Sequence, residues 1–124
     1  MKRDVAVWID HREAVIVAIS GEVEATSRLK SNIEKRVRFS SGEGGAEDQR
    51  DKRYANHLHK YYEAVVSCIG GAEAILLLGP GEAKHELEKR LRAEGFGAHI
   101  IGVETVDKMT GHQIAARARQ RLPK

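Results

Sequence analysis

The sequence predicts an α/β domain built on a mixed β-sheet, and three observations support this. Short apolar runs rich in β-branched residues, separated by tight turns, fill the first thirty positions. Helical periods follow later, with wholly apolar segments between them, and glycines mark many of the boundaries. A chain of 124 residues is the usual size of one domain and can bury one core.

The beginning of the chain predicts a three-stranded antiparallel meander. Residues 5–9 (VAVWI) and 14–20 (AVIVAIS) are apolar runs typical of buried strands. Gly21 ends the second run, and residues 22–29 alternate loosely as a third strand. Because connections this short join only antiparallel neighbours, the three strands must form a meander.

The rest of the chain predicts alternating helices and parallel strands. Apolar side chains recur every three or four positions in the helical segments, and the later strands are short and wholly apolar, as in buried parallel strands. In chain order we expect a helix over residues 49–69, a strand over 74–78, a helix over 82–94, a strand over 99–103 and a final helix that Thr110 and Gln113 cap.

The predicted order is therefore βββαβαβα. A meander followed by two right-handed crossovers is the ribonuclease H-like arrangement, a mixed five-stranded sheet with helices on both faces. We expect one domain over residues 1–124, with a flexible loop at about 30–47, because no apolar period survives in that segment. Loops of this length are often functional.

Positive charge is clustered, although the net charge is only +3. Between positions 28 and 60, nine Lys or Arg stand against five Asp or Glu. On the predicted helix, basic residues at spacings of three, four and three form one stripe that can follow a phosphate backbone. The stripe consists of Arg50, Arg53, His57 and Lys60. The tyrosines expected nearby are Tyr54, Tyr61 and Tyr62, and the C-terminal segment adds Arg117, Arg119 and Arg121.

Catalytic and metal-binding patterns are weak. Asp10 ends the first strand, where a two-metal nuclease would place a carboxylate, but the fourth strand ends in Leu78-Gly79 and offers none. We interpret Asp10 as a turn former. His57 and His59 point in different directions on a helix, and no Cys or His spacing suggests zinc. We assign no catalytic residue, no metal and no cofactor, and favour a non-enzymatic domain.

The chain has no segment long and apolar enough for a membrane span, and its N-terminus has no apolar leader. Its one cysteine, Cys68, is expected to pack in the core. We therefore expect a cytoplasmic protein with no membrane partner.

The run SSGEGGAEDQRDKRYANHLHKYYEAV resembles the segment of the archaeal and eukaryotic release factor and Pelota middle domain that holds the Gly-Gly-Gln loop and a long basic helix. The preceding VAVWIDHREAVIVAIS and IEKRVRF, and the later AILLLGPGEAKHELEKRL, follow the order of that family. The resemblance covers roughly residues 5–91. It implies a ribonuclease H-like fold and the ribosome as partner.

The glycine tripeptide of the release factors promotes peptidyl-tRNA hydrolysis. Here Gly44 and Gly45 match it, but Ala46 stands where the family has glutamine. The resemblance therefore implies a flexible contact element, with Gly42, Gly44, Gly45 and Ala46 at its tip, that lacks the side-chain amide used for release. Pelota-type relatives also lack the tripeptide.

We expect a translation-related RNA- or ribosome-binding module that does not hydrolyse peptidyl-tRNA. Arg36 and Arg38 would join the helix stripe in binding RNA. Two alternatives stay open. One is a peptidyl-tRNA hydrolase-like release or rescue factor. The other is a protein-interaction or stress-linked homo-oligomeric domain that uses a sheet edge.

Overall fold

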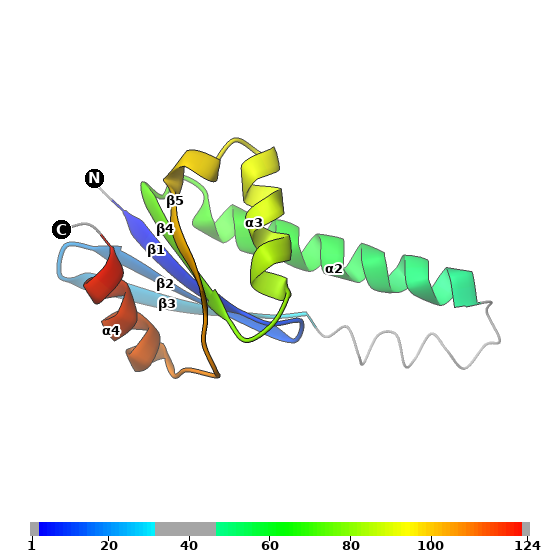
Figure 1. Ribbon diagram of the computed structural model, residues 1–124, viewed down its shortest axis with the longest axis horizontal. Coiled ribbons are helices and arrows are strands. Elements are labelled where there is room, and N and C mark those ends of the chain that lie inside the picture. Colours follow the sequence, from blue (N-terminus) through cyan, green and yellow to red (C-terminus); the bar gives the residue numbers. More distant parts are fainter. Residues whose placement is uncertain (1–2, 32–46, 123–124) are drawn as a thin grey trace.

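A computed structural model describes residues 3–31 and 47–122, with side chains described for 3–31 and 57–122. Figure 1 shows the elements in the predicted order βββαβαβα. They are β1 (Asp4–Ile9), β2 (Glu13–Ser20), β3 (Val23–Lys30), α2 (Glu47–Ile69), β4 (Ala74–Gly79), α3 (Ala83–Ala93), the short 3₁₀ turn η2 (Gly97–His99), β5 (Ile100–Thr105) and α4 (Gly111–Arg121).

The strands form one mixed five-stranded sheet in the order β3-β2-β1-β4-β5. β1 pairs antiparallel with β2, which pairs antiparallel with β3, so the predicted meander is confirmed. β1 also pairs parallel with β4, which pairs parallel with β5. Strands β1 and β4 are buried on both faces, and this explains why their sequences are continuously apolar.

Helices cover both faces of the sheet, as the sequence predicts (Figure 1). On one face, α2 and α3 pack their apolar sides on β1, β2 and β4. On the other face, α4 packs on the alternate residues of the same strands. Because side chains alternate along a strand, Val5 and Val7 lie in the first core, whereas Ala6 and Trp8 lie in the second.

The turn after β4 depends on one glycine. A Cβ atom added at Gly79 would lie 2.3 Å from the carbonyl oxygen of Ile9 at the end of β1, closer than real Cβ atoms come. The strand-to-helix turn at Gly79-Pro80-Gly81 is therefore a packing requirement.

The observed boundaries differ from the predicted ones by one or two residues. α2 begins at Glu47, two residues before the predicted start. The capping box of α4 is confirmed, because Thr110 Oγ1 accepts from the Gln113 amide at 3.2 Å and Gln113 Oε1 accepts from the Thr110 amide at 2.9 Å. Most of the loop predicted at about 30–47 lies outside the described residues. In the part of the chain that the structure describes, no helix is long and apolar enough to cross a membrane.

Candidate nucleic-acid interface

The predicted basic stripe lies on the half of α2 that projects beyond the sheet (Figure 1). Residues 47–69 form one continuous helix, so the positions of Arg50, Arg53, His57 and Lys60 follow one side of it. At a rise of about 1.5 Å per residue, the stripe is about 15 Å long. The side chains of Arg50 and Arg53 lie outside the described part of the chain.

The end of the stripe formed by His57 and Lys60 borders a hollow between α2 and the end of β3. The hollow has a volume of about 250 Å³. His57 is half-buried and Lys60 is exposed, and both line it together with Lys30 and Ser31. The helix stripe and the end of the edge strand thus meet at one place.

The turn between β1 and β2 lies against the same place. The Ser31 amide donates to the Arg12 carbonyl at 2.8 Å, and Ser31 Oγ donates to the His11 carbonyl at 2.7 Å. The exposed residue Arg12 is thereby fixed beside the end of β3. We call Arg12, Lys30, His57 and Lys60 the basic end. The residue across the sheet from Lys30 is Glu13, whose carboxylate pairs with Lys108 at 3.5 Å.

Sequence reasoning missed Arg12 and Lys30 as members of this surface. Neither has the helical spacing that identified the stripe. The meander brings Lys30 to the hollow beside α2 and Arg12 to the neighbouring Ser31, because β2 pairs with β3 from Glu13 to Lys30. The signal that could have found them is this pairing, since the ends of a meander strand and of its neighbouring turn must meet.

Tyr61 and Tyr62 were expected near the RNA surface, but both are buried. The burial of Tyr61 agrees with its place in the apolar period of the helix, whereas the expectation is wrong for Tyr62. Tyr61 is 5% exposed and Tyr62 is 1% exposed, and both pack in the core under α2 and α3. The Tyr61 hydroxyl donates to the Asp10 carbonyl at 2.9 Å, and the Tyr62 hydroxyl donates to Glu86 Oε2 at 2.7 Å. These rings are not available to stack on bases.

The surroundings keep both phenols protonated. Burial, and then the negative charges of Asp10 and Glu13, raise the pKa of Tyr61. Burial, and then the hydrogen bond and charge of Glu86, raise the pKa of Tyr62. Both hydroxyls therefore act as hydrogen-bond donors that fasten α2 to the strands and to α3.

Glu86 is the centre of a polar cluster that joins three parts of the chain. His11, from the turn after β1, lies 3.0 Å from Glu86 Oε1, and the hydroxyl of Tyr62 on α2 donates to Oε2. Burial acts to raise the pKa of Glu86, but the hydrogen bonds from His11 and Tyr62 and the charges of His11 and Arg90 outweigh it and lower that pKa. The cluster fixes α3 and α2 on the β1–β2 turn.

His59 extends this fastening along α2. Arg90 Nη1 lies 2.7 Å from His59 Nδ1, and Glu63 Oε1 lies 2.8 Å from His59 Nε2. Because a guanidinium can only donate, Nδ1 must accept and Nε2 must carry the proton, so His59 is a neutral link between α2 and α3. Arg90 also lies over the Tyr62 ring, 5.1 Å from its centre.

Asp10 forms the turn that the sequence analysis assigns to it. Its Oδ1 accepts from the amides of Arg12 and Glu13, both at 2.8 Å. Among the described residues, no three His, Cys, Asp or Glu side chains come close enough to hold a metal ion. Cys68 is a free, half-buried thiol that packs against the core.

The arginines of α4 are held by carboxylates of the same chain. Arg117 Nε and Arg121 Nε lie 2.9 Å and 2.8 Å from the two oxygens of Glu104, and Arg119 Nε lies 2.6 Å from Glu24. Each arginine is paired with a carboxylate, although Glu104 serves two of them, and the three lie on α4, away from the basic end. The loop residues Gly42, Gly44, Gly45 and Ala46, and the predicted RNA-binding residues Arg36 and Arg38, lie outside the described part of the chain.

The fold is similar to that of two Pelota proteins and of an archaeal translation termination factor. The chain superimposes on Pelota from Thermoplasma acidophilum with a TM-score of 0.62 and 18% identity, over 98% of this chain and 33% of that one. Pelota from Archaeoglobus fulgidus gives 0.58 and 12%, over 97% and 31%. An archaeal translation termination factor gives 0.56 and 13%, over 97% and 35%.

These similarities concern the fold, since all three identities lie below 20%. This chain spans about a third of the length of each of these proteins. No family model and no curated protein matches the sequence.

Proposed function

We propose that this chain is a translation-related RNA- or ribosome-binding module, with the ribonuclease H-like fold of the release factor and Pelota middle domain. The likeness to archaeal Pelota and termination factor structures over nearly the whole chain supports the translation context. The observation that carries the binding proposal is the basic end, at which Arg12, Lys30, His57 and Lys60 from three elements meet beside the projecting half of α2.

The mode of binding follows from what this surface offers. Lysine and arginine contact phosphates, which position a protein on RNA without reading its sequence. Tyr61 and Tyr62 are buried, so they cannot add base stacking. We therefore infer a tolerance for RNA sequence and a strong dependence on salt.

Peptide release is not part of the proposed function. Ala46 has no side-chain amide at the position where the release factors have glutamine. We infer that the segment with Gly42, Gly44 and Gly45 contacts the ribosome without promoting hydrolysis. Peptidyl-tRNA in stalled ribosomes should therefore stay intact when this protein is added.

Cosedimentation with ribosomes at two salt concentrations tests the proposal. With three or four phosphate contacts, affinity should fall roughly 10- to 100-fold between about 50 and 200 mM salt. Lys60→Glu should weaken binding at low salt and make the salt dependence shallower, and adding Arg50→Glu and Arg53→Glu should abolish binding.

The matched control is Lys89→Glu, which makes the same charge change at an exposed position on α3 that does not line the hollow. It should leave binding close to that of the unmodified protein. No cosedimentation at low salt, or equal losses from Lys60→Glu and Lys89→Glu, would reject the basic end as the interface.

A further inference from the structure

The strand β3 has an edge that no other described element pairs. β3 is the last strand of the sheet, and residues 21–28 are all exposed. Val23, at its start, is 69% exposed, the most exposed large apolar side chain among the described residues. An edge of this kind presents a row of N–H and C=O groups to any strand that fits it.

The direction of those groups follows from the hairpin between β2 and β3. Ser20 and Val23 are paired across a two-residue turn in which Gly21 has a φ of +62°. In such a hairpin the pair that closes the turn is hydrogen-bonded, and hydrogen-bonded pairs then alternate with non-bonded ones. The groups that point outward therefore belong to Glu24, Thr26, Arg28 and Lys30.

β3 lacks two of the features that prevent edge pairing, although it carries charged side chains. It contains no proline, and its eight residues pair with β2 without a bulge. The opposite edge of the sheet differs. β5 has a register shift beside Ile75 and a glycine at position 102, and its Glu104 is occupied by Arg117 and Arg121. The β5 edge is therefore irregular, whereas the β3 edge is long and regular.

The sequence of β3 is complementary to itself in one antiparallel register. A two-fold axis through Thr26, perpendicular to the sheet, places Glu24 opposite Arg28 of the second copy, and Arg28 opposite the second copy's Glu24. Opposite charges in directly facing positions stabilise a strand pair, and Thr opposite Thr is also favourable. The full set of facing pairs is Glu22 with Lys30, Val23 with Leu29, Glu24 with Arg28, Ala25 with Ser27 and Thr26 with itself.

Neighbouring registers fit less well. An axis through Glu24 or through Arg28 would place like charges opposite each other, which destabilises a pair. An axis through Ala25 or Ser27 would leave one charge of each strand opposite Thr26. Only the register centred on Thr26 pairs both signs of charge over the full strand, with the outward N–H and C=O groups facing each other.

The side chains on both faces of β3 agree with this register. On the α4 face, Glu24 already accepts from Arg119 at 2.6 Å, and Arg28 of the second copy would approach the same carboxylate. On the α2 face, the exposed Val23 would pack against Leu29 of the second copy, which adjoins its own core. Pairing would thus cover the apolar side chain that the single chain leaves in water.

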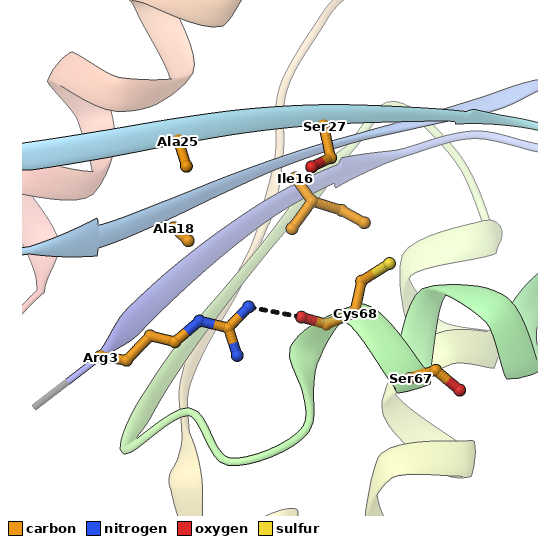
Figure 2. Close-up of a pocket in the computed structure, with 7 residues that line it drawn as sticks. All are labelled: Arg3, Ile16, Ala18, Ala25, Ser27, Ser67 and Cys68. Atoms are coloured by element: carbon orange, nitrogen blue, oxygen red, sulfur yellow. Dashed lines mark hydrogen bonds between the residues drawn. The ribbon is translucent and has the colours of Figure 1, made fainter. Parts of the chain in front are cut away.

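The α2 face of the sheet is open where it reaches β3. Figure 2 shows an open hollow on the α2 face, of about 420 Å³, into which Ile16, Ala18 and Ala25 point from the sheet. Its other wall is the end of α2, where Arg3 donates to the carbonyl oxygens of Cys68 at 2.7 Å and Gly70 at 3.0 Å. The small Ala25 and Ser27, which face each other across the axis, offer no steric obstacle to pairing.

We propose that β3 pairs antiparallel with β3 of a second copy of this chain, in the register centred on Thr26, so that one continuous sheet runs through both copies. The dimer and the proposed RNA binding share Lys30, but they are tested apart, because the variants that test the dimer change Glu24 and Arg28 and those that test RNA binding change α2.

Charge-reversal variants test the pairing and its register. Glu24→Arg places Arg opposite Arg28, and Arg28→Glu places Glu opposite Glu24, so each variant alone should sediment as a monomer at concentrations where the unmodified chain is a dimer. Mixed together, the two variants restore opposite charges at all four positions and should form a heterodimer. Sedimentation velocity gives the mass, and circular dichroism confirms that each variant is folded.

Two results would overturn the proposal. One is an unmodified chain that stays monomeric up to high micromolar concentration. The other is a dimer that persists in both single variants, which would place the contact on another surface. Lys89→Glu, with the same size of charge change away from β3, should leave the mass unchanged and serves as the control.

Discussion

The two halves of α2 differ in what they contact. The half that ends at Ile69 is packed on the sheet, with Tyr61, Tyr62 and Val65 almost fully buried. The half that begins at Glu47 projects past the strands in Figure 1 and carries the basic stripe. We call the packed part, residues 61–69, the anchor, and the part that carries the basic stripe, residues 47–60, the arm.

This difference teaches how a small domain can hold a row of basic positions on a helix that extends past its sheet. A row of cations gains no stability from its own repulsion, so packing elsewhere in the same helix must order it. Here the order comes from the hydroxyls of Tyr61 and Tyr62 and from Arg3 at the helix C-terminus. Mutations in the anchor should cost stability, and mutations in the arm should cost binding.

The largest effect on stability is expected from Tyr62→Ala. Removing a buried aromatic ring leaves a cavity and costs about 3–5 kcal/mol in the free energy of unfolding. The paired variant is Lys60→Ala on the arm, which should change stability by no more than about 0.5 kcal/mol because its side chain is exposed. Urea unfolding measures both. Similar costs for the two variants would contradict the division of α2 into anchor and arm.

A smaller loss of stability is expected when either tyrosine hydroxyl of the anchor is removed, and the two losses should differ. Tyr62→Phe removes a hydrogen bond to the Glu86 carboxylate and should cost about 1.5–3 kcal/mol. Tyr61→Phe removes a hydrogen bond to the uncharged backbone carbonyl of Asp10 and should cost about 0.5–1.5 kcal/mol. Thermal and urea unfolding should rank the two variants in this order, and the reverse order would show that the carboxylate contact is not the stronger one. Neither variant should change cosedimentation with ribosomes once its stability is taken into account.

The anchor could be predicted from the sequence in outline only. The apolar period of residues 49–69 predicts which face of α2 is buried, and Tyr61, Val65 and Ile69 are found there. The hydroxyl partners could not be predicted, because Asp10 and Glu86 lie far from the tyrosines along the chain and meet them only in the fold. The same reason explains why Tyr62, which does not belong to that apolar period, was wrongly expected near the RNA surface.

The arm shows the opposite pattern. Its spacing could be read directly, because one continuous helix fixes where each stripe position lies. Spacing along the helix could not show which residues from other parts of the chain join the basic surface and which are paired elsewhere. Arg12 and Lys30 join it through the meander, whereas Arg117, Arg119 and Arg121 are held by Glu104 and Glu24, which come from strands of the sheet.

The smallest expected effect is a loss of stability at acid pH, and it arises from the contacts of Glu86 with the anchor. The pKa of Glu86 is lowered in the fold from an ordinary value of 4.5, so the folded chain favours the ionised carboxylate more than the unfolded chain does. The resulting stabilisation is complete above this ordinary value and is lost as pH falls through the lower value of the folded state. Glu86→Gln cannot titrate, so the difference in unfolding free energy between the unmodified chain and this variant should shrink as pH falls below about 4.5.

Urea unfolding at a series of pH values measures that difference. Glu94→Gln, at an exposed position just after α3, provides the matched control for loss of one carboxylate. A difference that stays constant from neutral pH down to acid would mean that the contacts of Glu86 with His11 and Tyr62 do not favour its ionised form. The link between α3 and α2 would then rest on apolar packing and on the neutral His59 bridge.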